Sequence, residues 1–279
     1  MAKERPWLSN ILVLALSHVQ RRRRYEWPWG CRAIPKLNKD NLKAENMKPA
    51  LYLLSGLLCD QTVWQAQIDA LKGIRDIYAL DFQGFDNLSA MAEHVLSQTP
   101  EVFALAGHSM GARVALEIVR LAPHRVERLA LFDTGSHPVK AGEKEARQKL
   151  LDLAREHGME ALASQWLPPM MSPENVSNAS LLDPLKTMVC SMSLETFEGQ
   201  IRALLNRPDA SLGLASIQCP TLIGVGREDT WSNIAQHELM ALAIERSRLV
   251  IFERSGHMAP YEAPIAVSTA MREWLLHTN

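Results

Sequence analysis

The chain has 279 residues, of which 47% are hydrophobic, and a formal net charge of −1 at neutral pH. This length and composition allow one main domain with a large buried core. The near-zero charge gives no electrostatic reason to expect nucleic acid or acidic partners for the chain as a whole.

The cysteine pattern excludes two further classes of protein. Four cysteines lie far apart, with no Cys-x-x-Cys pair and no histidine cluster at metal-ligand spacing. They are Cys31, Cys59, Cys190 and Cys219. The pattern therefore indicates neither a disulfide framework nor a zinc site, and it predicts a protein of the reducing cytoplasm.

Residues 1–46 differ from the rest of the chain in charge. They hold ten Lys or Arg residues against four Asp or Glu, a net of +6, which leaves −7 for residues 47–279. The segment contains an apolar run at residues 11–16 and four consecutive arginines at residues 21–24. We interpret residues 1–46 as a basic leader that is separate from the fold and poorly ordered.

Other interpretations of this leader follow from its composition. A secretory signal would need a small-residue cleavage site, which is missing. A membrane anchor would need roughly 20 apolar residues, and Ser17 and His18 end the run before that length, so stable membrane insertion is not expected. Two other interpretations stay open. Residues 1–46 are sequence upstream of a natural start at Met47, or they attach the protein peripherally to an acidic surface through the arginines.

From Met47 onward, short apolar runs alternate with amphipathic stretches of helical length. Strands are predicted at residues 50–54, 76–80, 102–106, 126–132, 220–225 and 248–252. Helices are predicted at residues 60–71, 88–98, 110–121 and 263–276. This alternation predicts the α/β class, with a mostly parallel sheet flanked by helices.

A long interruption separates the fourth and fifth predicted strands. Residues 137–216 lack strand signals, and helical periodicity is present at residues 143–157, 159–166 and 194–206. We therefore predict an inserted helical lid at 137–216, within a core formed by residues 47–136 and 217–279.

The segment LAGHSMGARVAL, residues 105–116, places a serine between two glycines where a buried strand ends and a helix begins. A strand that turns directly into a helix strains the residue at the turn and leaves room only for very small neighbours. Gly107 and Gly111 provide that room, so Ser109 is expected to expose its hydroxyl at the carboxyl end of the sheet. The amide of Met110 would then point at an oxygen bound above Ser109.

A serine hydroxyl needs a nearby base to become a nucleophile. His257 follows the last predicted strand, in the loop Arg-Ser-Gly-His-Met-Ala-Pro, and is the candidate base. Asp229 follows the preceding strand and is the candidate acid that orients the imidazole. Asp133, after another predicted strand, is an alternative acid, and a loop hydrogen-bonding role is the other interpretation of it.

The chain from residue 47 resembles the α/β-hydrolase superfamily in two features. The first is the order of Ser109, Asp229 and His257 in the sequence, and the second is the Gly-His-Ser-Met-Gly turn that carries the serine, known as the nucleophile elbow. The turn at residues 53–60, followed by Trp64, adds to the resemblance, although Ser55 stands where the superfamily usually has histidine. The resemblance implies a serine esterase with a catalytic triad, an oxyanion hole formed by the Leu57 and Met110 amides, and no cofactor or metal.

The lid is expected to carry substrate selectivity. With His108 beside the nucleophile, Trp166, Met188 and Met192 are candidate pocket residues, and packing of the lid onto the core is the alternative role for each. Arg202 and Arg207 are candidates for binding a substrate carboxylate. Cys59 is either a reactive thiol or a buried one. The remaining histidines are expected at the surface: His18, His94, His124, His137, His157, His237 and His277.

The function predicted from these residues is hydrolysis of a carboxylic ester, thioester or lactone of a small molecule. Two alternatives stay open. One is a C–C hydrolase or lyase like those of the menaquinone pathway, which uses the same triad as a base. The other is a hydrolase-fold binding protein without turnover. The sequence determines neither the substrate nor the oligomeric state.

Overall fold

A computed structural model describes residues 48–277 of the chain. The chain divides into two units, Met1–Met47 and Lys48–Asn279, and the fold below is that of the second. The basic leader predicted at residues 1–46 lies outside the described residues.

A six-stranded parallel sheet forms the centre of the fold, with the strand order β2-β1-β3-β4-β5-β6. The strands are β1 (Leu51–Leu54), β2 (Ile77–Leu80), β3 (Phe103–His108), β4 (Val126–Phe132), β5 (Thr221–Gly226) and β6 (Ser247–Phe252). All six were predicted within two residues at each end. The α/β fold class predicted from the alternating pattern is therefore confirmed.

The apolar content of each strand matches its place in the sheet. Strands β1, β3 and β5 are buried along their whole length, as expected for inner strands covered on both faces. The edge strands β2 and β6 are largely half-buried, and Tyr78 on β2 is 50% exposed.

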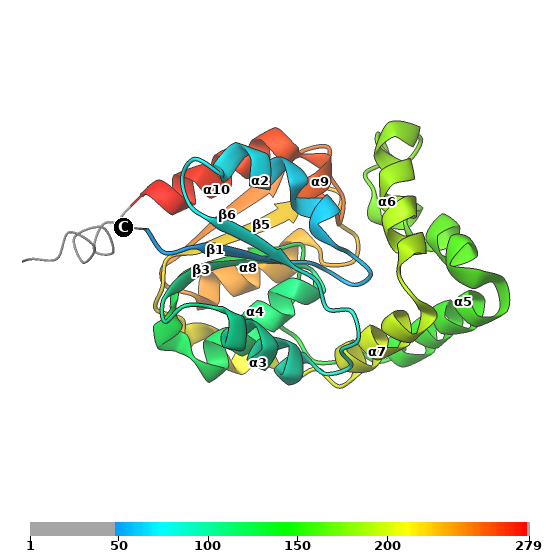
Figure 1. The fold of residues 1–279 in the computed structure, drawn as a ribbon, viewed down its shortest axis with the longest axis horizontal. Helices are drawn as coiled ribbons and strands as arrows, with labels where there is room; N and C mark the ends of the chain where they lie inside the picture. Colours follow the sequence, from blue (N-terminus) through cyan, green and yellow to red (C-terminus); the bar gives the residue numbers. More distant parts are fainter. Residues whose placement is uncertain (1–47, 278–279) are drawn as a thin grey trace, which may run out of the picture. The chain divides into compact units, whose positions relative to one another are not determined.

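Helices cover both faces of the sheet (Figure 1). On one face lie α2 (Gln65–Leu71), α9 (Ala259–Glu262) and α10 (Pro264–Leu276), and on the other lie α3 (Leu88–Gln98), α4 (Met110–Leu121) and α8 (Ile234–Ala243). Short 3₁₀ helices η1 (Gln61–Trp64) and η2 (Pro123–Arg125) precede α2 and β4. Asn87 begins α3 by accepting hydrogen bonds from the amides of Ser89 and Ala90.

A helical insertion lies between β4 and β5, at the carboxyl ends of the strands (Figure 1). It contains α5 (Glu143–Trp166), η3 (Pro168–Met170), α6 (Ala179–Ser191), α7 (Leu194–Leu205) and η4 (Ala210–Ser216). Gly158, with φ 83°, breaks α5 at the boundary between the two helices predicted there. The exact limits proposed for the lid, 137–216, stay a prediction.

Three α-helices within residues 48–277 were not predicted: α6, α8 and the four-residue α9. Helix α6 carries Pro184 in its interior, where proline removes a helical hydrogen bond. Helix α8 carries His237, which was expected at the surface but is fully buried. Its Nε2 accepts a hydrogen bond from the Thr134 amide at 3.0 Å, and burial lowers its pKa to about 4. The surface prediction for His237 was therefore wrong, because tertiary packing provides partners that are remote in sequence.

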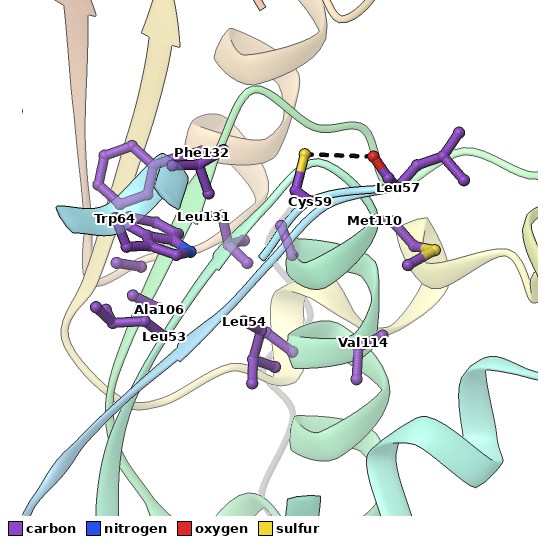
Figure 2. Packing of buried hydrophobic residues seen from close by; sticks show 14 of the residues in the cluster. Leu53, Leu54, Leu57, Cys59, Trp64, Ala106, Met110, Val114, Leu131 and Phe132 are labelled. Carbon is purple, nitrogen blue, oxygen red and sulfur yellow. Dashed lines mark hydrogen bonds between the residues drawn. The ribbon is translucent and has the colours of Figure 1, made fainter. Parts of the chain in front are cut away.

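The hydrophobic core packs the helices onto the sheet around large side chains. Trp64 is fully buried and its ring meets that of Phe132 edge-on, with centroids 5.8 Å apart. Figure 2 shows the two rings together beside β4. Because Trp64 ends η1, the first helical turn after β1, this contact holds the chain after β1 close to the end of β4.

Gly111 marks the closest approach of α4 to the sheet. A Cβ atom at this position would lie 2.2 Å from the carbonyl oxygen of Leu54, far inside van der Waals contact. Since both groups are backbone, neither can move aside without shifting the helix or the strand.

We expect Gly111→Ala to lower the free energy of unfolding by about 1–3 kcal/mol or more, as overpacking typically does. Urea denaturation followed by circular dichroism measures the change. Gly73→Ala is the matched control, because a Cβ atom at Gly73 would meet nothing within 4 Å. Equal stability of the two variants would contradict the close approach.

Candidate active site

Ser109 occupies the turn between β3 and α4. Its backbone has φ 54° and ψ −113°, a conformation that L-residues rarely adopt. The Ser109 amide donates to the carbonyl of Phe132 at 2.9 Å, which secures the turn to the end of β4. A Cβ atom at Gly107 would lie 2.5 Å from the Ala112 backbone, so the glycines flanking Ser109 are required by packing.

The structure brings Ser109, His257 and Asp229 together from the ends of three strands. The Ser109 hydroxyl donates to His257 Nε2 at 2.8 Å, and His257 Nδ1 donates to Asp229 Oδ2 at 2.9 Å. An ionised carboxylate can only accept hydrogen bonds, so Asp229 fixes the tautomer in which Nδ1 carries the proton. The other oxygen, Oδ1, accepts from the amides of Trp231 and Ser232 at 2.8 and 2.9 Å.

The electrostatics of this trio follow from its burial. Burial alone would lower the pKa of His257, but the charge and hydrogen bond of Asp229 raise it above its ordinary value of 6.5. For Asp229, burial acts to raise the pKa, and the charge and hydrogen bond of His257 outweigh it, so the net shift is downward. The arrangement therefore favours an ionised Asp229 and a histidine that accepts a proton readily.

Asp133 lies next to this trio but contacts backbone instead of the imidazole. It is fully buried, and its two oxygens accept from the amides of Gly226 and Ala259 at 2.9 Å each. Burial and then the negative charge of Asp229 raise its pKa. Asp133 thus ties the end of β5 to the segment after His257, which matches the loop hydrogen-bonding interpretation.

The backbone amides of Leu57 and Met110 belong to residues that line the cavity with Ser109. Neither the Leu57 amide nor the Met110 amide donates to an acceptor within residues 48–277. Met110 begins α4, whose first amides have no partner inside the helix. Ser55, which stands where a histidine was expected, donates through Oγ to the carbonyl of Asp60 at 3.0 Å.

Gln200 supports the loop after β1 and was not identified from the sequence. Its Oε1 accepts from the Leu58 amide at 2.8 Å, and its Nε2 donates to the carbonyl of Phe82 at 3.1 Å. Leu58 has φ 54°, so its loop is in a conformation that must be held from outside. Gln200 lies on α7, 142 residues away in sequence, and no local motif connects it to Leu58.

The insertion also contacts the histidine loop. The His257 amide donates to the carbonyl of Met170 at 2.7 Å. Glu262 accepts from the amides of Gly256 and Ser172, both at 2.8 Å. The segment after α5 and the loop that carries His257 are therefore held together from both sides.

A cavity of about 780 Å³ opens above Ser109, a volume typical of small-molecule sites. His108, Ser109, Trp166 and His257 line it, together with Leu57 and Met110. Two predicted pocket residues do not line it. Met188 and Met192 are buried, and Met188 Sδ accepts from the Asp60 amide at 3.4 Å. Met188 thus packs the insertion onto the core, which was the alternative role considered for it, and Met192 belongs to the same cluster of buried hydrophobic residues.

His108 lines the cavity as a neutral side chain. Its Nε2 donates to the carbonyl of His257 at 2.8 Å, and burial together with the nearby His257 lowers its pKa to about 3. Cys59 is buried, and burial and the charge of Asp60 raise the pKa of its thiol to about 12, which disfavours the thiolate. Figure 2 shows its thiol directed at the carbonyl of Leu57.

Within the part of the chain that the structure describes, no group of three or more His, Cys, Asp or Glu side chains has the arrangement of a metal site.

Residues 51–270 match the model of the alpha/beta hydrolase family. The chain belongs to the alpha/beta hydrolase family. This match covers the sheet, the whole helical insertion and the flanking helices up to the middle of α10, and it confirms the resemblance to this family that the sequence indicates.

Several hydrolases and esterases resemble the chain at 23–27% identity. The (E)-2-((N-methylformamido)methylene)succinate hydrolase of Acinetobacter baylyi is 23% identical and is matched over 81% of this chain and 89% of its own length. The pimeloyl-[acyl-carrier protein] methyl ester esterase of Nitrosomonas europaea is 24% identical over 76% and 90%. A thermophilic esterase structure from Thermogutta terrifontis, with malate bound, has 27% identity and a TM-score of 0.74, over 82% and 90%.

None of the helices within residues 48–277 is long and apolar enough to cross a membrane. The cytoplasmic location predicted from the cysteine pattern stays a prediction.

We expect the pKa of His257 to lie above 6.5 in the folded protein, and to fall below its ordinary value in Asp229→Asn, where burial is no longer opposed by the carboxylate. NMR titration of the histidine Cε1 protons measures both values. Asp133→Asn is the control and should lower the pKa less, because Asp133 makes no hydrogen bond to the imidazole. An Asp133→Asn effect as large as that of Asp229→Asn would instead favour Asp133 as the partner of His257.

Proposed function

We propose that this protein is a serine hydrolase that cleaves a carboxylic ester, thioester or lactone through an acyl-enzyme on Ser109. The observation that carries the proposal is the continuous chain of hydrogen bonds from Ser109 Oγ through His257 to Asp229, at 2.8 and 2.9 Å, at the base of a cavity. This is the arrangement that turns an ordinary hydroxyl into a nucleophile.

In the first half of the reaction, Ser109 Oγ attacks the acyl carbon while its proton moves to His257 Nε2. Asp229 stabilises the imidazolium that forms, and the carbonyl oxygen of the substrate becomes an oxyanion. The free amides of Leu57 and Met110 are the donors proposed to bind it. The tetrahedral intermediate then breaks its bond to the alcohol or thiol, which leaves with the proton from His257.

In the second half, water replaces the leaving group. His257 removes a proton from the water, the hydroxide attacks the acyl carbon of the acyl-enzyme, and the bond to Ser109 Oγ breaks. His257 returns the proton to Ser109. The product is the free carboxylic acid, and no external oxidant, reductant or cofactor takes part in this sequence of steps.

The relatives support an ester-type bond without defining the substrate. One relative is named as a methyl ester esterase, and the structural neighbour is named as an esterase. Cleavage of an ester bond is compatible with the proposed acyl-enzyme. Identities of 24% and 27% leave the acyl group open. We expect the residues that line the cavity walls to determine which substrate this chain selects.

The first test is labelling with a fluorophosphonate probe, which reacts with activated serines. Wild-type protein should be labelled, and Ser109→Ala should not be labelled. Hydrolysis of p-nitrophenyl esters of graded chain length should fall by a factor on the order of 10⁴ or more in the variant. A folded wild-type protein that resists labelling would contradict the proposal and favour a binding protein. Labelling without hydrolysis of any ester would favour C–C cleavage or elimination.

The support of the oxyanion loop gives a second test. We expect Gln200→Ala to lower kcat for p-nitrophenyl esters about tenfold or more with a smaller change in KM, because the released Leu58 loop would displace the Leu57 amide. Gln148→Ala, at an exposed position of the same insertion, is the control. A change in KM alone would contradict the positioning role of Gln200.

A further inference from the structure

The charged side chains around the cavity are mostly basic. Five basic residues line it: Arg113, Lys140, Arg147, Lys149 and Arg207. Only two carboxylates, Glu143 and Glu145, belong to the same lining. The whole chain has a net charge of −1, so this concentration of positive charge is a local property of the cavity.

Of these five residues, Arg113 is the one on α4, the helix that follows the turn at Ser109. It lies four residues after Ser109, and its amide donates to the Ser109 carbonyl at 3.3 Å across the first turn of α4. Arg113 and Ser109 both line the cavity.

Arg113 is held in place by a backbone group. Its Nη1 donates to the carbonyl of His137 at 3.0 Å. Arg207 donates through Nε to the same carbonyl at 3.2 Å, so two guanidinium groups converge on one oxygen. This carbonyl orients Arg113 without neutralising its charge.

The nearby carboxylate is already engaged by the other two arginines. Glu143 accepts from Arg207 Nη2 at 2.6 Å and from Arg147 Nη2 at 2.9 Å. Burial acts to raise the pKa of Glu143, but its hydrogen bonds to Arg207 and Arg147 lower it to about 2. By contrast, Arg113 forms no ion pair with any carboxylate of residues 48–277.

The surroundings of Arg113 therefore leave its charge poorly compensated. Burial, and then the positive charge of Arg207, lower its pKa to about 9, so the side chain stays protonated at neutral pH. A partly buried charge without a counter-ion is costly. A carboxylate from outside the protein would relieve that cost, and arginine binds carboxylates through a fork of two donors.

We propose that Arg113 forms an anion subsite that binds a carboxylate of the substrate while the scissile carbonyl lies at Ser109. The substrate class is an ester, thioester or lactone that carries a second, ionised carboxyl group. Because Ser109 and Arg113 line the same cavity, the chain between the scissile carbonyl and the carboxylate must be short enough to lie within it. This inference rests on the proposed hydrolase function and defines the substrate of that same site.

The carboxylate can belong to either product of the hydrolysis. In a half-ester of a dicarboxylic acid it stays on the acyl group, and in an ester of a hydroxy acid it leaves with the alcohol. Arg113 would bind the same group in both cases, so substrates of both kinds are compared with neutral analogues of the same length.

The experiment measures kcat/KM for monomethyl adipate against methyl hexanoate, and for the acetate ester of 4-hydroxybutyrate against butyl acetate. We expect at least one charged ester to exceed its neutral analogue by about tenfold to a hundredfold, the range of a hydrogen-bonded charge pair. In Arg113→Met the ratio should fall toward one, and in Arg113→Lys it should be intermediate. The matched control is Arg202→Met, because Arg202 is largely exposed and outside the cavity lining.

A charged-to-neutral ratio near one or below for both pairs in the wild-type protein would overturn the proposal, even if Arg113→Met fails to fold. So would a ratio that Arg113→Met leaves unchanged.

A binding measurement distinguishes failure of the proposed hydrolase function from failure of the anion subsite. If neither fluorophosphonate labelling nor ester hydrolysis is detected, thermal denaturation with and without monomethyl adipate still tests the subsite. Stabilisation of the wild-type protein that Arg113→Met abolishes would support the anion site without the hydrolase. Equal melting temperatures with and without the compound would overturn it.

Discussion

The strained turn at Ser109 is the constraint on which the rest of the site depends. A backbone at φ 54° and ψ −113° costs on the order of 1–3 kcal/mol and persists only where packing leaves no alternative. Here α4 lies so close to β1 that Gly111 would clash with the carbonyl of Leu54 if it had a side chain. Because helix and strand are both buried, this approach is maintained by the core, and it directs the Ser109 hydroxyl into the cavity.

The turns after neighbouring strands share this property. Leu58, Ser109, Asp133 and Arg254 are the residues other than glycine with positive φ in the described part of the chain, and each follows the carboxyl end of a strand. Contacts from distant segments hold three of these turns. Gln200 on α7 holds the Leu58 amide, Phe132 accepts from Ser109, and Asp133 itself accepts from the ends of two later segments. Contacts between segments far apart in the chain therefore hold these turns in place.

The helical insertion has a structural part in this arrangement beyond covering the cavity. It contacts the loop after β1 through Gln200 and the histidine loop through the Met170 carbonyl. It also brings Glu143, Arg147 and Arg207 to the same cavity lining as Arg113. Glu143 forms ion pairs with Arg147 and Arg207, and no ion pair joins Arg113 to a carboxylate of the described residues. Selectivity for charge would then arise where the insertion meets the core, whereas Ser109, Asp229 and His257 belong to the core alone.

The sequence by itself determined the fold class, all six strands, and the approach of serine, aspartate and histidine to one edge of the sheet. These follow from local pattern: apolar runs of strand length, and reactive residues placed where parallel strands end. Only the tertiary structure decided between Asp229 and Asp133 as the neighbour of the His257 imidazole, since both follow buried strands and a single hydrogen bond distinguishes them. It also decided the supporting role of Gln200, the burial of His237, the absence of Met188 and Met192 from the described cavity wall, and the position of Arg113 beside two other arginines. Each of these depends on contacts between residues far apart in the chain, which no local periodicity encodes.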